Sequence, residues 1–79
     1  MAKTIHVAGV RYRILELAPA NRGPRYLLRS DDGDLFGLFA QNAAPTRFVA
    51  FPLVADREET NALARVDFFE TDRGLIARR

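Results

Sequence analysis

Short apolar runs alternate with turn-forming residues along the whole chain, a pattern typical of a β-rich fold. In Val10–Ile14, apolar and charged residues alternate with the period of two that a pleated strand requires. The pattern starts at Thr4, and Gly9 only interrupts it, so we expect a long leading strand. At Ile14–Leu15 the apolar side changes parity, and a change of one residue predicts a β-bulge or a sharp coil at that point.

The strongest hairpin signal lies in the middle of the chain. The segments Arg25–Ser30 and Leu35–Ala40 flank an acidic turn, Asp31–Asp34, whose Asp32-Gly33 offers the positive φ that tight hairpin turns require. The second segment is apolar on both parities. One of its faces can serve the core, while the other needs a loop, a partner or a second chain to cover it. Gly37 within it predicts a bulge or the close approach of another backbone.

A loop, a strand and a short helix are predicted next. Residues 41–45 contain asparagine and proline and are expected to form the loop, and Arg47–Phe51 is expected to form a strand that Pro52 ends. An aspartate with a glutamate three places on, in Asp56–Glu59, resembles a capping box. We therefore expect a helix of about two turns that ends at residues 63–64.

A closing hairpin completes the predicted fold. Thr71–Gly74 is a good turn sequence between the strand-like segments Ala64–Glu70 and Leu75–Ala77. Regular spacing of short strands with turn signals predicts an all-β fold with one short helix. We expect a small five- to six-stranded SH3-like barrel, with an OB-like barrel as the alternative, formed by residues 1–79 as a single domain.

Length and composition limit what this fold can do. A chain of 79 residues buries only ~60% of the surface that its unfolded form exposes, so its core is thin. It has no cysteine to form a disulfide, and oligomerisation is a common remedy at this size. No apolar stretch approaches the ~20 residues of a membrane helix, and no secretory signal is recognisable. We therefore expect a cytoplasmic protein without membrane contact.

Residues suited to catalysis or metal binding are scarce. The chain has one histidine, and nothing local brings His6 to Ser30 to form a nucleophilic pair. The acidic turn Asp31–Asp34 lacks the later glutamate of a calcium-binding loop. We therefore predict that the protein is not an enzyme and has no metal or cofactor, and we infer no small-molecule substrate.

Arginine dominates the basic residues, although the net charge is only +2. Guanidinium groups bind phosphate and carboxylate and stack on rings or bases. Arg11 and Arg13 share one face of a predicted strand, and Arg25 and Arg29 belong to a neighbouring strand that also carries Tyr26. If these five residues share one face, they form a surface for RNA or single-stranded DNA, which is the alternative function.

Phenylalanine is more abundant than the core of so small a barrel requires. Six phenylalanines lie in three predicted strands, and the centres of protein interfaces favour aromatic residues and arginine. The leading hypothesis is therefore a non-enzymatic protein-interaction module or small regulatory adaptor, which binds a protein partner or a second copy of itself as a homodimer. The predicted interface residues are Phe39, Phe48, Phe51 and Phe69.

Overall fold

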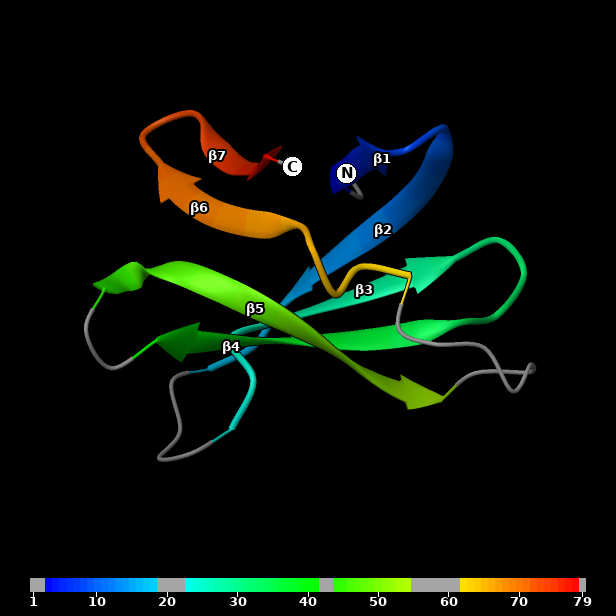
Figure 1. The fold of residues 1–79 in the computed structure, drawn as a ribbon, viewed down its shortest axis with the longest axis horizontal. Helices are drawn as coiled ribbons and strands as arrows, with labels where there is room; N and C mark the ends of the chain where they lie inside the picture. Colours follow the sequence, from blue (N-terminus) through cyan, green and yellow to red (C-terminus); the bar gives the residue numbers. More distant parts are fainter. Residues whose placement is uncertain (1–2, 19–22, 42–43, 55–61, 79) are drawn as a thin grey trace.

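Among the described residues, seven strands follow one another in an antiparallel meander that curls into a nearly closed barrel (Figure 1). The computed structural model describes residues 3–18, 23–41, 44–54 and 62–78. The strands are β1 (Lys3–Val7), β2 (Val10–Glu16), β3 (Tyr26–Ser30), β4 (Leu35–Gln41), β5 (Ala44–Val54), β6 (Asp67–Thr71) and β7 (Gly74–Arg78). The prediction of an all-β barrel is confirmed, but the barrel has more strands than the five or six expected.

The additional strand comes from a turn at Ala8–Gly9, where one long leading strand was expected. Ala8 has a φ of 50° and Gly9 a φ of 80°, and Val7 and Val10 on either side are the last pair of the β1–β2 ladder. A two-residue hairpin turn of type I′ has positive φ at both central positions, which explains the glycine. Alanine in the first position is not a turn signal, so the sequence pattern predicts one strand.

Replacing Ala8 with asparagine is expected to stabilise the protein by about 0.5–1 kcal/mol. An alanine side chain is strained at positive φ, whereas asparagine tolerates that region and precedes glycine in the favoured hairpin turns. For a domain of this size the change raises Tm by about 2–8 °C, which thermal unfolding followed by circular dichroism measures. Ala8→Val is the matched control and is expected to lower Tm. A lower Tm for Ala8→Asn would contradict the turn geometry.

The two predicted hairpins are confirmed, and glycine supplies the positive φ in both. In the β3–β4 loop, Gly33 has a φ of 94° and its N–H donates to the Ser30 carbonyl at 3.1 Å. The Ser30 hydroxyl accepts a further bond from the Asp34 N–H at 3.1 Å. In the β6–β7 turn, Gly74 has a φ of 109°, and the Thr71 hydroxyl donates to the Gly74 carbonyl at 2.7 Å.

The bulge predicted at Ile14–Leu15 is absent. Ile14 pairs with Leu28 and Leu15 pairs with Leu27 in an unbroken β2–β3 register. The prediction was wrong because it required every large apolar residue of β2 to face the core. Instead the strand stays regular, and Leu15 lies on the outside of the barrel.

Strand β5 is longer than predicted at both ends. It begins at Ala44, inside the predicted loop of residues 41–45, and it runs through Pro52. Pro52 pairs with Phe36 beside a register shift in the β4–β5 ladder, and an irregular site of this kind accommodates a residue without an N–H. The predicted helix start at Asp56–Glu59 lies outside the described residues. Its predicted end falls in residues 62–65, which form a turn.

The core fills the barrel with side chains that alternate along each strand. It contains Val7, Tyr12, Tyr26, Leu28, Phe36, Leu38, Phe48, Ala50, Leu63, Val66 and Phe68. Two edge-to-face ring pairs connect strands that are two apart in the sheet: Tyr12 on β2 with Phe36 on β4 at 5.9 Å between ring centroids, and Tyr26 on β3 with Phe48 on β5 at 5.4 Å. No helix in the described part of the chain is long and apolar enough to cross a bilayer.

Closure of the barrel gives the sheet distinct inner and outer faces. Strands β1 and β7 lie next to each other, and both marked chain ends lie there (Figure 1). No ladder joins these two strands among the described residues. Since the inside is filled by the core, any surface for a ligand must lie on the outer face, at the ends or along this seam.

Burial of the two tyrosines makes the stability of the barrel sensitive to alkaline pH. Burial raises the pKa of Tyr12, and the Asp34 charge adds to the effect. Burial also raises the pKa of Tyr26, which donates a hydrogen bond to the nearby Glu70 carboxylate. A raised folded-state pKa means that the stabilising contribution of the neutral phenol is present below about pH 10 and is lost as the pH rises through that pKa.

We therefore expect Tm to fall more steeply above about pH 10 in the wild type than in Tyr12→Phe/Tyr26→Phe. Phenylalanine keeps the ring but cannot ionise, so the double variant lacks this source of alkaline destabilisation. Thermal unfolding between about pH 8 and pH 12 measures the difference. Parallel pH profiles for the two proteins would contradict the raised pKa values.

Candidate functional site

Apolar side chains cover the outside of the barrel across strands β2 to β5. Leu15, Leu27, Gly37 and Phe51 are successive partners in three neighbouring ladders, so they form one row across the four strands. Leu15 is 56% exposed and Phe51 is 51% exposed. We call this surface the outer apolar face and define it by Leu15, Leu27, Leu35, Phe39, Phe51 and Leu53.

Gly37 allows the aromatic part of this face to close over β4. A Cβ atom at Gly37 would lie 2.9 Å from Cε1 of Phe39, 3.2 Å from Cδ1 of Leu53 and 3.3 Å from Cβ of Pro24. The rings of Phe39 and Phe51 meet edge to face at 5.6 Å. The glycine therefore makes room for side chains, and neither the predicted bulge nor another backbone occupies that space.

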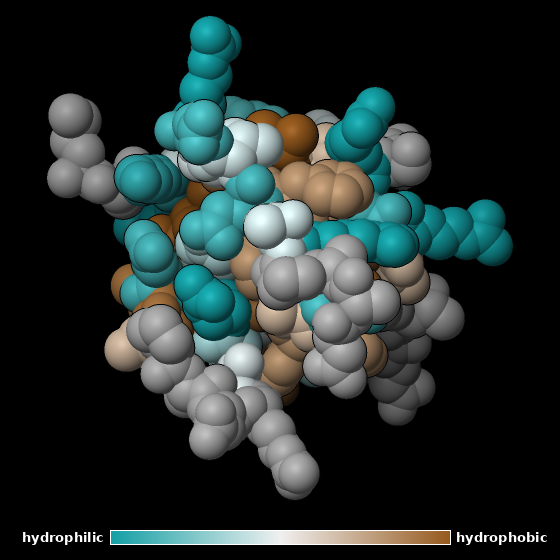
Figure 2. Space-filling view, turned by 90° about the vertical axis from the view of Figure 1, so that its left-hand side faces the viewer, coloured by the Kyte–Doolittle hydropathy of each residue, from teal (hydrophilic) through white to brown (hydrophobic). Residues whose placement is uncertain are grey.

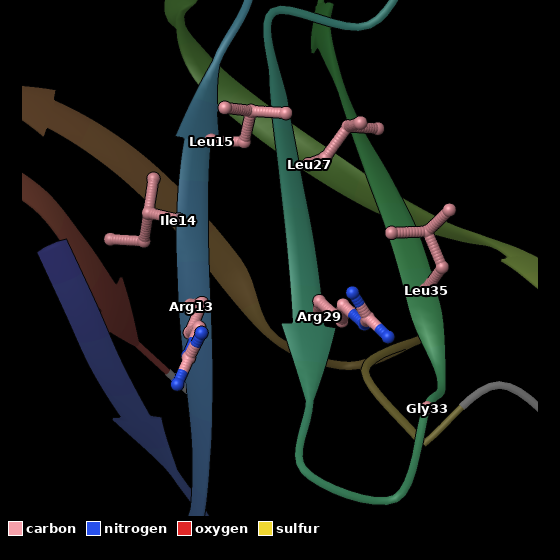
Figure 3. Close-up of a pocket in the computed structure, with 7 residues that line it drawn as sticks. All are labelled: Arg13, Ile14, Leu15, Leu27, Arg29, Gly33 and Leu35. Atoms are coloured by element: carbon pink, nitrogen blue, oxygen red, sulfur yellow. The ribbon is translucent and has the colours of Figure 1, made fainter. Parts of the chain in front are cut away.

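The aliphatic part of the face contains a hollow of about 520 Å³. Leu15, Leu27 and Leu35 lie around it, one from each of β2, β3 and β4, and the guanidinium groups of Arg13 and Arg29 lie beside them (Figure 3). The hollow is positioned by the regular ladders, because side chains at alternate positions of three adjacent strands point outward together. It is open to solvent.

Arg13 and Arg29 are directly opposite each other in the β2–β3 ladder. Like charges in this position destabilise a sheet. Among the described residues no carboxylate forms a salt bridge with either of them, whereas Arg11 on the same face bonds Asp31 at 3.2 Å. The two arginines also line a second hollow, of about 230 Å³, with Ser30 and Asp31. The two arginines therefore line both an apolar hollow and a polar hollow.

The predicted interface residues divide between three places. Phe39 and Phe51 lie together on the outer apolar face. Phe69 lies on the outside of β6, opposite Arg47, and the Arg47–Asp67 salt bridge of 2.8 Å runs alongside it. Phe48 is 0% exposed and belongs to the core, so its assignment to a surface is wrong. Strand β5 is apolar on both parities, and its pairing with β4 and β6 turns Phe48 inward.

The residues predicted for nucleic-acid binding are only partly brought together. Arg11, Arg13 and Arg29 share the outer face of β2 and β3. Tyr26 is buried against Phe48 and offers no ring for stacking on a base. Arg25 is half-buried, and its Nε atom is buried without a hydrogen-bond partner among the described residues. The predicted combination of arginine and tyrosine on one surface is therefore absent.

His6 and Ser30 lie on opposite faces of the sheet. His6 is exposed on β1 opposite Arg11, whereas Ser30 is buried and its hydroxyl accepts the bond from Asp34. No group of three or more potential metal ligands occurs in the part of the chain that the structure describes.

The leucines of the outer apolar face were not predicted from the sequence. Leu15, Leu27 and Leu35 belong to strands in which apolar residues occupy both parities, and that pattern was the available signal. The predicted interface includes only phenylalanines.

Comparison with known protein families, curated proteins and solved structures finds no match to this chain, so the evidence for the site is its own geometry.

Proposed function

We propose that this protein is a non-enzymatic interaction module, a small regulatory adaptor that binds another protein through its outer apolar face. The observation that carries the proposal is the row of outward-facing apolar residues across β2 to β5, in which Leu15 is 56%, Phe51 51% and Leu53 47% exposed and the members on β3 and β4 are more buried. Monomeric soluble proteins rarely expose contiguous apolar patches larger than a few hundred Å². An apolar patch that contains aromatic residues and has arginine beside it has the composition of an interface.

Strands provide a rigid base for such a face. Hydrogen-bonded ladders hold β2 to β5 in fixed register, so the side chains of the face are placed before a partner arrives. Figure 2 shows one side of the barrel, from which long hydrophilic side chains project past areas of hydrophobic residues. SH3-like and OB-like barrels both serve as binding modules. The assignment of this barrel to either class stays a prediction. The cytoplasmic location also stays a prediction.

A second candidate function is binding of RNA or single-stranded DNA. The observation in its favour is the trio Arg11, Arg13 and Arg29 on one outer face. A labelled oligonucleotide bound there would be released steeply as salt rises, since phosphate contacts displace counterions. We rank this function below protein binding because Tyr26 is buried and Arg11 is already paired with Asp31.

The proposed function is tested by capture of partners on the immobilised protein and on two matched variants. Phe51→Ser removes an exposed ring of the outer apolar face, and Ile76→Ser removes a side chain of similar exposure, 43%, from the outside of β7. We expect the captured protein to be lost with Phe51→Ser and retained with Ile76→Ser. Light scattering of the purified chain then shows whether the captured partner is a second copy. Equal capture by both variants would contradict the proposal.

A further inference from the structure

The two hollows on β2 and β3 form one site with an apolar and a charged part. Leu15 pairs with Leu27, and Arg13 pairs with Arg29, in the same regular ladder. Both arginines line the apolar hollow and the polar hollow. In Figure 3, Leu15 and Leu27 lie toward one end of this surface and the two arginines toward the other, with Leu35 beside Arg29. A ligand that spans the site meets both kinds of group.

The charged part lacks a negative partner within the described part of the chain. Arg13 and Arg29 repel each other across the ladder. Asp31 forms its salt bridge with Arg11 and with neither of these two arginines. A carboxylate placed between the two guanidinium groups would relieve this repulsion. It would also accept the short, charge-assisted hydrogen bonds that arginine forms with carboxylates.

A second copy of the chain, paired through the centre of this site, does not supply that carboxylate. A two-fold dimer whose axis passes between Arg13 and Arg29 would bring arginine against arginine. Asp31 on that surface is paired with Arg11, and Asp67 farther round the barrel is paired with Arg47. Charge complementarity therefore favours a partner of different sequence.

Residue spacing sets the form of the partner segment. Arg13 and Leu15 are two residues apart on β2, as are Leu27 and Arg29 on β3, which corresponds to about 6.6 Å along a strand. We propose, on the basis of the proposed function, that the site binds an extended acidic peptide segment of a partner protein. The segment presents a glutamate or aspartate to Arg13 and Arg29, and an aliphatic or aromatic residue two positions away to the leucines.

The test is selection of a displayed library of random linear peptides on the immobilised full chain. We expect the enriched peptides to share an acidic residue and an apolar residue two positions apart. A selected peptide carrying a fluorescent label is then titrated with the wild type and with Arg13→Gln/Arg29→Gln. We expect the double variant to bind at least about tenfold more weakly, and replacement of the acidic residue of the peptide by its amide to have the same effect.

The outcomes separate this inference from the proposed function. Peptides that depend on Leu15 and Leu27 but not on the arginines would overturn the carboxylate inference and leave a binding face. Peptides that depend on neither pair, or no enrichment at all, would contradict both. A short single-stranded oligonucleotide that displaces the selected peptide in an arginine-dependent way, and binds more tightly than it, would assign the arginines to phosphate and overturn the peptide proposal.

Discussion

Replacing Phe48 with alanine is expected to lower the free energy of unfolding by about 3–5 kcal/mol. The ring is 0% exposed and packs edge to face on Tyr26 at 5.4 Å, so its loss leaves a cavity in the centre of a thin core. A domain of this length is stable by only about 4–12 kcal/mol in total. Urea unfolding followed by circular dichroism measures the change, and Phe48→Leu serves if the alanine variant does not fold.

Phe51→Ala is the matched control for this prediction. The two rings are three residues apart on β5, but Phe51 is 51% exposed and lies on the outside of the barrel. We expect its replacement to lower stability by less than about 1 kcal/mol. Equal losses for the two variants would contradict the orientation of β5, and with it the separation of core from outer apolar face.

Replacing Leu15 and Leu27 together with serine is expected to weaken partner binding by about 100-fold. The two side chains are ladder partners on the outside of β2 and β3 and line the apolar hollow. Each lost apolar anchor in the centre of an interface costs about 1–2 kcal/mol, and every 1.4 kcal/mol is about tenfold in affinity. Anisotropy of a labelled selected peptide measures the change.

The same double variant is expected to fold normally, because Leu15 is 56% exposed, Leu27 is half-buried on the outside of β3, and neither belongs to the core. Its Tm is expected to stay within a few degrees of the wild type. Ile76→Ser is again the matched control, since it shortens an exposed side chain on β7, and its affinity is expected to be unchanged. Equal weakening by the control would show that binding depends on general surface hydrophobicity and would contradict a defined face.

Local turn chemistry is the part of the fold that the sequence predicts well. Glycine at 33 and 74 has positive φ in the structure, and both hairpins form where the turn residues place them. The turn at Ala8–Gly9 is not predicted, because alanine carries no turn signal. Pro52 is predicted to end its strand, but a register shift in the ladder accommodates it and the strand continues. In both cases the structure depends on pairing with a neighbouring strand. Local propensity carries no information about that pairing.

Which face an apolar residue occupies is harder to predict. In β5 both Phe48 and Phe51 are large and aromatic, and only the ladders with β4 and β6 decide that Phe48 points inward. In β2 the parity change at Leu15 was interpreted as a bulge, although the regular ladder simply turns Leu15 outward. A surplus of apolar strand residues was visible in the sequence, but its location on one outer face needed the three-dimensional pairing.

The most direct test of the binding face is a map of the backbone amides that respond when a partner is bound. Amide nuclear magnetic resonance spectra of the isotope-labelled protein are recorded with and without the captured partner or a selected peptide. We predict that the changes gather on β2 to β5, at Leu15, Leu27, Arg29 and Phe51. Changes confined to β6, β7 and β1, or spread evenly over the barrel, would contradict the account.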